Sequence, residues 1–358
     1  MKNEDNGIRR NINGYIGFFA TYVAIRIYAH KSSKEQIFNL LKGMYFAYVI
    51  VLFIGLLQGI YIYLGHAAIL ESFFKTILSR GYTYFVDIDL GGRVDFTFSE
   101  PSLVGLYFYC FFVPTHWLCK KYSLINKKTL DSVLLLAVSL NILTLSARLL
   151  FDTVVFFLIW QMSKIHKLSV GRKKLIKTVF IGMAGISALL VLVFFVIPRE
   201  IVSNYISRFT NVFDSIGFDS FQGDQSSTVR LALVSAAIKG FLGNPIFGVG
   251  LGGFVKALEC YAVLPVNNVL ARNELIQIIG NPESTSYSFY FTTICESGVF
   301  GIISIITVIQ TLRKNRMKEL RILSWIIIYM FIQVELFGAL PIALWLAVMN
   351  SRSILAAT

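Results

Sequence analysis

Arginine outnumbers lysine in three of the polar segments that connect the apolar stretches of this chain. The connections at 67–99 and 198–285, with the short one near residue 148, hold three lysines but seven arginines. The planar guanidinium of arginine presents a fork of N–H donors that suits bidentate recognition of phosphate or carboxylate. These connections therefore predict an anion-binding face, with surface pairing to nearby Asp and Glu as the alternative for any single arginine. The arginines are Arg80, Arg93, Arg148, Arg199, Arg208, Arg230 and Arg272.

A glycine-rich stretch, GNPIFGVGLGGF at 243–254, places Gly248, Gly250 and Gly253 in the spacing G-x-G-x-x-G. This spacing binds a dinucleotide only where it follows a strand and opens a helix in a βαβ unit. Here it follows the end of a predicted helix and belongs to no βαβ pattern, so we expect no nucleotide. The glycines allow backbone N–H groups to approach either a ligand or another helix closely, and both alternatives stay open.

The elements that must position these residues are membrane helices. Hydrophobic residues make up 56% of the 358 and charged residues 15%, and the mean hydropathy is +0.67, values outside the range of a soluble domain. The N-terminal stretch MKNEDNGIRRNING is polar, so no signal peptide is expected. The histidines and cysteines show no H-x-x-H or C-x-x-C spacing, so no metal is expected.

Apolar runs predict an all-α polytopic membrane protein with about eight or nine transmembrane helices. A span needs about 20 mostly apolar residues. A further segment at 15–29 carries Arg26 and either crosses with a snorkelling arginine or lies partly in the interface. The expected spans are 43–66, 100–119, 130–146, 148–163, 175–197, 286–310, 322–337 and 339–351.

Basic clusters set the expected orientation. The clusters at 31–42, 120–128, 164–177 and 313–321 should be cytoplasmic, and the net charge of +13 reports this asymmetry, not nucleic-acid binding. The chain is then a single integral membrane domain, 1–358. Its segment 67–99 and its large loop 198–285 face the outside.

Periodicity predicts structure within these outer segments. An amphipathic helix at 199–213 carries Arg208 on its polar face. A second helix begins at Ser226 or Ser227 and ends near Gly243, which places Arg230 in its first turn, where free N–H groups and the helix dipole favour an anion. A third helix within 267–280 carries Arg272, and alternating residues at 84–98 predict a hairpin.

Four motifs together resemble the O-antigen polymerase and ligase superfamily. RLALVSAAIKGFLGNPIFGVGLGGF, from residue 230, is similar to its outer-loop motif of an Arg, a helix, Asn-Pro and a glycine turn. SFYFTTICESGVFG, from residue 288, resembles its Ser-Phe-Tyr and Glu-x-Gly pattern. FSEPSLVG at 98–105 is similar to the Phe-x-Glu-Pro-Ser motif of the polymerase branch, and LTLSARLLF at 143–151 to a Ser-Arg hairpin.

The resemblance implies a Wzy-type polymerase in the bacterial inner membrane, with its active site facing the periplasm. Such enzymes transfer an oligosaccharide from undecaprenyl diphosphate to a sugar hydroxyl of the next lipid-linked repeat unit. No cofactor, metal, nucleotide or nucleic acid is implied. The implied partners are the lipid-linked oligosaccharide, the bilayer, and the flippase and chain-length regulator of the same pathway.

The chemistry of that reaction assigns expected roles. Fixed arginine donors would stabilise the charge that develops on the leaving diphosphate. For this we expect Arg230 first, then Arg208, Arg148 and Arg272, with Arg93, Gly248, Gly250 and Tyr287 contributing to substrate binding. Many ligase-like members have His where this chain has Tyr287. Glu283 and Glu100 are therefore the expected bases for the acceptor hydroxyl, and a helix cap or a buried hydrogen bond is the alternative role for either.

Two other functions stay open. A ligase would pass the glycan to lipid A core, but the Glu-Pro-Ser motif and the missing His disfavour it. A lipid-linked sugar transporter should show two similar halves or paired broken helices. The sequence shows no such repeat.

Overall fold

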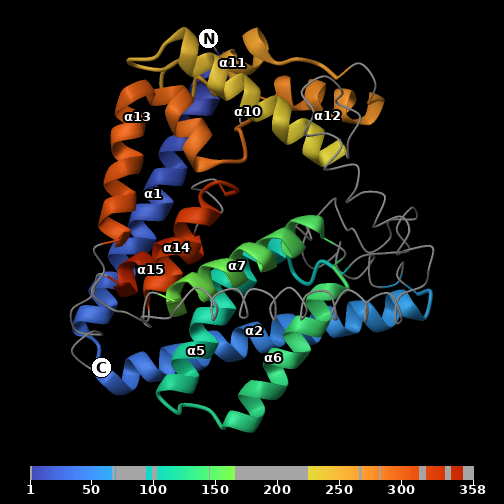
Figure 1. Ribbon diagram of the computed structural model, residues 1–358, viewed down its shortest axis with the longest axis vertical. Helices are drawn as coiled ribbons and strands as arrows, with labels where there is room; N and C mark the ends of the chain where they lie inside the picture. The colour runs from blue at the N-terminus through green and yellow to red at the C-terminus, as the bar shows by residue number, and fades with distance from the viewer. Residues whose placement is uncertain are drawn as a thin grey trace. The chain divides into compact units, whose positions relative to one another are not determined.

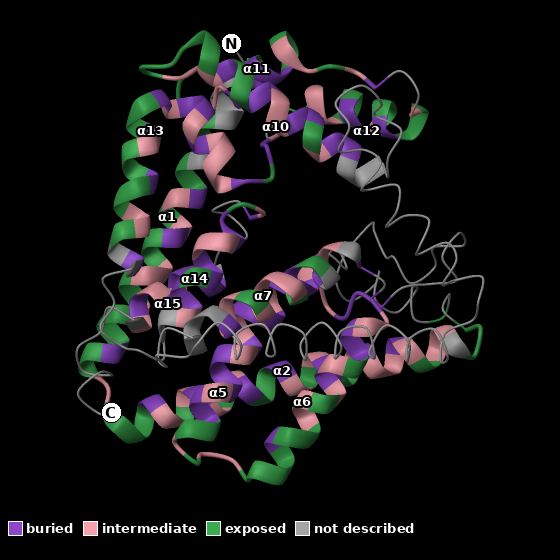
Figure 2. Cartoon of the chain, viewed as in Figure 1, coloured by how far each residue is buried: buried purple, intermediate pink, exposed green. Residues whose placement is uncertain are grey.

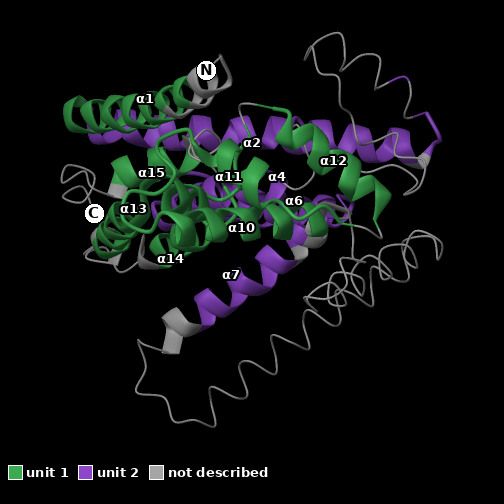
Figure 3. Cartoon of the chain, turned by 90° about the horizontal axis from the view of Figure 1, so that it is seen from above, with its two compact units in different colours: residues 1–31, 207–358 green, residues 32–206 purple. Residues whose placement is uncertain are grey.

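The computed structural model describes residues 2–66, 69, 94–98, 103–144, 146–165, 225–265, 268–281, 284–313, 320–334 and 340–349. Within these ranges every regular element is helical (Figure 1), which confirms the expected all-α fold. The predicted hairpin is described only at 94–98, where the chain forms a turn. The chain divides into two compact units, distinguished in Figure 3. Unit 1 comprises residues 1–31 and 207–358, and unit 2 comprises residues 32–206.

Unit 2 begins with helix α2, Lys34–Tyr63, which covers the predicted span 43–66 as far as residue 63. A capping box starts it: the Ser33 hydroxyl accepts from the Gln36 N–H at 3.3 Å, and the Gln36 side chain accepts from the Ser33 N–H at 2.8 Å. These bonds satisfy N–H groups that have no partner inside the helix. Residues 34–62 form one of two helical stretches in the described chain that are long and apolar enough to cross a membrane, and the other is 289–310.

The predicted span 100–119 is observed from residue 103 as one helical run with a wide turn in its middle. It comprises α4 (Leu103–Tyr107), the π-helical turn η3 (Phe108–Phe112) and α5 (Val113–Lys121). Pro114 follows the π turn and lacks the N–H that a regular helix would use at this point. Phe112 stacks on Tyr45 and Tyr48 of α2, with ring centroids 5.8 and 4.7 Å apart, so the run is fixed against α2.

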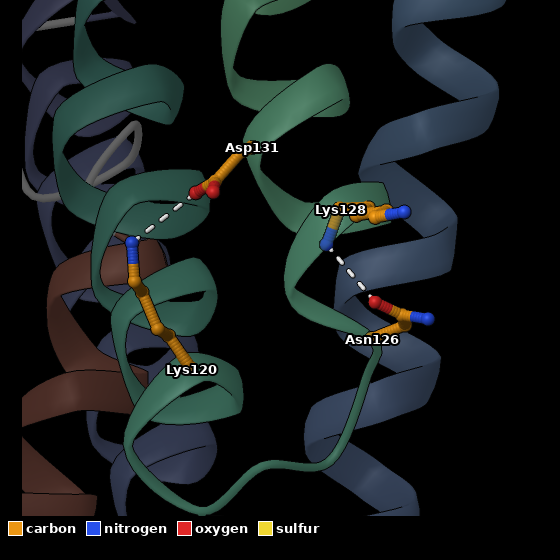
Figure 4. A network of polar contacts seen from close by, with 4 residues as sticks. All are labelled: Lys120, Asn126, Lys128 and Asp131. Carbon is orange, nitrogen blue, oxygen red and sulfur yellow. Dashed lines mark hydrogen bonds and ion pairs between the residues drawn. The ribbon is translucent and has the colours of Figure 1, made fainter.

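A short polar loop joins α5 to α6, Lys127–Ile142 (Figure 4). The Asn126 side chain caps α6 by accepting from the Lys128 N–H at 3.0 Å, and Lys120 pairs with Asp131 at 3.2 Å. After α6 the chain turns and enters α7, Ala147–Ile165. Ser146 caps α7, because its hydroxyl accepts from the Leu149 N–H at 3.3 Å.

Unit 1 opens with α1, Lys2–Lys31, an unbroken helix of 30 residues that contains the segment 15–29 and packs against α15, Leu340–Met349. Helix α14, Leu320–Met330, precedes α15. Helix α14 ends before the span predicted at 322–337 does, because residues 331–333 form turns, and α15 lies within the span predicted at 339–351. The turn that follows α14 is bonded to the start of α13, because the N–H of Phe289 donates to the carbonyl oxygens of Phe331 and Val334, each at 3.1 Å.

The remaining helices of unit 1 pack together around one apolar core. They are α10 (Gln225–Gly243), α11 (Phe254–Tyr261), α12 (Val269–Ile279) and α13 (Phe289–Arg313). The core is built from small and branched side chains of all four, including Leu233, Leu258, Leu275 and Cys295. The predicted helices in 226–242 and 267–280 are thus confirmed as α10 and α12. The Asn268 side chain caps α12 by accepting from the Ala271 N–H at 2.9 Å.

Candidate functional site

Helix α13 is broken at Gly298, the last residue of the Glu-x-Gly motif. Gly298 has φ 60° and ψ −135°, values far from those of a helix. In an unbroken helix the N–H of Val299 would donate to the carbonyl of Cys295. Here it donates to the carbonyls of Pro245 and Ile246 instead, at 2.9 and 3.2 Å. The break therefore frees the Cys295 carbonyl for another donor.

The glycine turn, residues 244–253, supplies the missing donors. Its Val249 N–H donates to the Cys295 carbonyl at 2.9 Å, and its Gly250 N–H donates to the Glu296 carbonyl at 3.1 Å. A Cβ at Gly248 would lie 2.5 Å from each of these two carbonyl oxygens. Only glycine allows the turn to approach α13 this closely, and φ of 68° at Gly248 is a second reason for glycine there.

We call the backbone contact between residues 244–253 and residues 295–299 the interlock. It shows which partner the glycines approach. The N–H of Gly248 donates to the Asn244 carbonyl at 2.8 Å, and that of Gly253 to the Gly250 carbonyl at 2.9 Å. The amides of the turn at 248, 249, 250 and 253 thus donate within the chain. The structure supports the helix alternative, and ligand contact by Gly248 and Gly250 stays a prediction.

The start of α13 carries a cluster of hydroxyl groups, Thr285, Ser286, Ser288 and Thr292, around an exposed tyrosine. The Ser286 hydroxyl donates to the Ser288 carbonyl at 3.0 Å and lies 2.8 Å from the Thr292 hydroxyl. The Ser288 hydroxyl donates to the Phe331 carbonyl at 3.4 Å. These bonds fix the backbone on both sides of Tyr287.

Tyr287 itself is held in a strained conformation. Its φ is 55°, which is a genuine outlier for a bulky residue, and its N–H donates to the Thr285 hydroxyl at 3.3 Å. The neighbours at 285, 286 and 288 are buried, whereas 44% of Tyr287 is exposed. Strain of this kind costs about 1–3 kcal/mol and persists where the surrounding structure enforces it, often at functional sites. Tyr287 is therefore the predicted site residue that the geometry of unit 1 singles out.

The two described arginines of the outer loop lie on different helices of unit 1. Arg230 is half-buried on α10. Because Gln225 already belongs to α10, Ser226 and Ser227 lie inside the helix and Arg230 lies beyond its first turn. The prediction that Arg230 lies in the first turn of α10 is wrong. The N–H groups of the first turn, which have no partner within the helix, come before Arg230 in the chain. Arg272 lies on α12 with an exposed side chain.

Arg148 lies in unit 2, near the start of α7. It is half-buried, and Asp152, four residues later, is fully buried. The Asp152 carboxylate lies against α4: a Cβ at Gly105 would be 2.5 Å from its Oδ2 atom. Thr153 beside it accepts from the Tyr109 hydroxyl at 2.6 Å. The Ser-Arg hairpin is thus attached to the helix that follows the Glu-Pro-Ser motif.

A buried glutamine in α2 provides a second polar contact that the sequence analysis missed. The Gln58 amide donates to Asp95 Oδ1 at 2.8 Å and to the Phe96 carbonyl at 2.6 Å, and it accepts from the Phe96 N–H at 2.7 Å. Gly55 makes room for the Phe96 ring, since a Cβ at Gly55 would overlap it at 2.2 Å. This contact, the Gln58 clamp, anchors residues 94–98 directly before the Glu-Pro-Ser motif. A polar residue in the apolar run GLLQG was the available signal.

The remaining predicted site residues, Arg93, Glu100, Arg208 and Glu283, lie outside the described residues. No family model, curated protein or solved structure matches the chain. The geometry of the two units therefore carries the functional argument.

Proposed function

We propose that the chain is an integral membrane glycosyltransferase of the O-antigen polymerase type. It crosses the inner membrane of a bacterium with eight or nine helices and presents residues 67–99 and 198–285 to the periplasm. It transfers an oligosaccharide from undecaprenyl diphosphate to a sugar hydroxyl of the incoming repeat unit. The new bond forms between that hydroxyl oxygen and the anomeric carbon. The bond from that carbon to the diphosphate oxygen breaks, and undecaprenyl diphosphate leaves.

One observation carries this proposal: two of the motifs that resemble the O-antigen polymerase and ligase superfamily are hydrogen-bonded to each other. The glycine turn and the Glu-x-Gly motif are joined by four backbone hydrogen bonds, from Val249, Gly250 and, in both of its bonds, Val299. The residue types that define the two motifs are the ones that the contact needs, because side chains at Gly248 and Gly298 would collide with the opposite backbone. The glycines of both motifs thus follow from one packing requirement.

Helix α1 carries an exposed apolar surface, although it is not among the two described helical stretches that are apolar enough to cross a membrane. Its exposed apolar residues recur along one stripe, and about 19 residues of helix at about 1.5 Å each match a hydrocarbon core of about 30 Å. Arg26 near its end donates to the Tyr22 hydroxyl at 3.2 Å, which fits an arginine that extends toward the interface. The stripe comprises Ile8, Ile12, Ile16, Phe19, Val23 and Ile27.

The proposed chemistry rests on arginine and a carboxylate base. Arg230, with Arg208, Arg148 and Arg272, stabilises the negative charge that grows on the departing diphosphate. Glu283 or Glu100 accepts the proton of the attacking hydroxyl. Tyr287, exposed among buried hydroxyl-bearing neighbours, contacts the substrate at the start of α13.

The broken helix α13 is the feature that the transporter alternative would use, because discontinuous membrane helices offer free carbonyls to ions. In α13 the carbonyls of Cys295 and Glu296 accept from N–H groups of the glycine turn. The break thus serves packing, which favours the enzyme over the transporter.

Complementation tests the function. In a strain that lacks its own polymerase and makes the cognate repeat unit, this chain should convert single-repeat lipopolysaccharide into a ladder. An unchanged single-repeat band rejects the polymerase. Restoration of glycan attachment in a ligase-deficient strain instead would establish the ligase.

Two substitutions of Arg230 test its role. Arg230→Ala should abolish the ladder, and Arg230→Lys should impair it because lysine lacks the bidentate fork. Lys239→Ala is the matched control, since Lys239 is an exposed cation on the same helix α10. Full activity of both Arg230 variants would remove Arg230 from the site.

A further inference from the structure

Lysines gather at one end of unit 2, where α2 begins and a loop joins α5 to α6. Helices α2 and α5 run antiparallel: the Cys119 thiol donates to the Leu41 carbonyl at 3.8 Å, and Phe112 stacks on Tyr48 farther along α2. The start of α2 therefore lies beside the end of α5. Figure 2 shows the first turn of α6, next to the loop, as exposed. We name this end of unit 2 the basic end, and its six lysines are Lys34, Lys42, Lys120, Lys121, Lys127 and Lys128.

Two aromatic rings from different segments meet at the basic end. The rings of Phe38 in α2 and Tyr122 at the end of α5 lie 5.1 Å apart, and we name them the ring pair. The Lys34 Nζ atom lies over the Phe38 ring, 5.5 Å from its centroid. The Lys121 Nζ atom lies over the Tyr122 ring at 5.3 Å. Attraction to a ring face positions an ammonium group, so the ring pair holds two exposed positive charges from two parts of the chain.

The backbone that carries the ring pair is fixed on both sides. After α5, the N–H of Leu124 donates to the Cys119 carbonyl at 2.9 Å. The N–H of Ser123 donates to the Lys120 carbonyl at 3.3 Å, and Ser123 has φ 52°. These two bonds and the left-handed residue form a Schellman motif, which ends a helix in a defined way. The capping box described above fixes the first turn of α2, so both lysines extend from ordered helix ends.

The uncharged part of α2 gives the level of the ring pair in a bilayer. Helix α2 is continuous from its first residue to its last. Its residues 43–63 contain no Lys, Arg, Asp or Glu, and their length of about 31 Å matches a hydrocarbon core of about 30 Å. If α2 crosses the membrane, Lys42 lies at the boundary of the core. Phe38 then lies about 7 Å outside the core, within a headgroup layer that adds about 5–8 Å on each side.

The charge of the basic end is strongly positive at this level. Residues 32–42 and 119–131 contain six lysines and two acidic residues, a formal charge of +4. Of the two acids, Asp131 pairs with Lys120 at 3.2 Å. Figure 4 shows the Lys128 side chain pointing away from that ion pair. The anions of a headgroup layer are lipid phosphates, so an anionic phospholipid is the ligand that complements this charge.

We propose that the basic end binds the phosphate headgroup of an anionic phospholipid on the ring pair. Lys34 and Lys121 donate charge-assisted hydrogen bonds to the phosphate oxygens, and the rings hold both ammonium groups at the depth of that phosphate. Lysines that only fix the orientation of the chain in the membrane would need no such rings. This inference depends on α2 crossing the membrane and not on the proposed reaction.

Native mass spectrometry of the full chain tests the inference. The chain is purified in a mild detergent and titrated with phosphatidylglycerol, which is anionic, or with phosphatidylcholine, whose phosphate is balanced by a cation. We expect phosphatidylglycerol to bind at least about tenfold more tightly. Excess inorganic phosphate should leave the lipid bound. Equal affinity for the two lipids, or displacement of phosphatidylglycerol by inorganic phosphate, overturns the proposal.

Paired substitutions locate the lipid. Lys34→Gln with Lys121→Gln should weaken phosphatidylglycerol binding about tenfold or more and leave phosphatidylcholine binding unchanged. Lys34→Arg with Lys121→Arg should keep the preference, because arginine retains the charge and the contact with the ring. Lys127→Gln with Lys128→Gln is the matched control: it removes the same charge from the same end but not from the ring pair, and should weaken binding less than about threefold.

Two outcomes of these substitutions overturn the ring-pair site. One is unchanged phosphatidylglycerol binding in the Lys34→Gln, Lys121→Gln variant. The other is an equal loss in the control variant, which would show that the charge of the basic end attracts lipid without a defined site. Both outcomes are independent of the complementation assay.

Discussion

Replacing Gly298 with alanine tests the interlock between α13 and the glycine turn. The backbone at Gly298 has φ 60° and ψ −135°, and holding an L-residue in such a region costs about 1–3 kcal/mol. The new Cβ would also lie 2.5 Å from the carbonyl oxygens of Pro245 and Ile246. Relief of that contact separates these oxygens from the Val299 N–H, which adds about 1–3 kcal/mol where water cannot replace the bonds. We therefore expect Gly298→Ala to lower the free energy of unfolding by about 2–6 kcal/mol.

Two other glycines are matched controls, because each lacks one or both of these effects. Gly250 has φ 92° but open space around its Cβ position, so Gly250→Ala should cost only the strain of a left-handed residue, about 1–2 kcal/mol. Gly17 lies inside α1 with nothing within 4 Å of its Cβ position. Gly17→Ala should therefore stabilise the protein by about 0.5–1 kcal/mol.

The assay is unfolding in mixed micelles with increasing sodium dodecyl sulfate, followed by tryptophan fluorescence. Trp345 in α15 is fully buried in unit 1 and reports its loss of packing. The predicted order of stability is Gly17→Ala, then Gly250→Ala, then Gly298→Ala. If Gly298→Ala is no less stable than Gly250→Ala, the turn does not contact α13 in the way described.

The other predictions concern single polar contacts. Gln58→Leu should destabilise the protein by at least ~2 kcal/mol, because Asp95 loses a buried hydrogen-bond partner. Adding Asp95→Leu should recover part of this loss in the same assay. Strictly additive losses of stability would contradict the Gln58 clamp. Tyr287→Gly should raise the free energy of unfolding by about 1 kcal/mol as the strain is released, while the ladder in the complementation assay is reduced; a destabilised variant would argue against strain. Asn126→Ala should cost about 1 kcal/mol as a lost helix cap, whereas Lys120→Ala should change stability by less than about 0.5 kcal/mol because its ion pair is exposed; the reverse order would contradict both assignments.

Local patterns in the sequence predict most of the helices correctly. Helices α2, α10 and α12 follow from apolar runs and periodicity, and α12 ends next to Gly280, within the predicted range 267–280. These features depend on neighbouring residues alone. The cap of α10 is an exception: two serines predict its start, but Gln225 before them already belongs to the helix.

Features that depend on distant residues were not predictable. A glycine inside an apolar helix is usually tolerated without a break. Gly298 breaks α13 because the turn at 244–253, far away in the sequence, offers carbonyls to the Val299 N–H. Gln58 likewise has its hydrogen-bond partners outside α2, in residues 94–98, and the sequence of α2 alone does not indicate them. The turn after α14 likewise depends on a distant segment, because the carbonyls of Phe331 and Val334 accept from the N–H of Phe289.

The interlock also determines where this chain can change in length. Val249 and Gly250 pair with Cys295 and Glu296 at the same sequence offset, so the two segments are in register. One inserted residue inside either segment would shift every following donor away from its acceptor. An insertion in the polar connection between α12 and α13 changes the sequence offset between the two segments but leaves the hydrogen bonds between them unchanged. Relatives that share this interlock should therefore keep the spacing within each motif and vary in the number of residues between them.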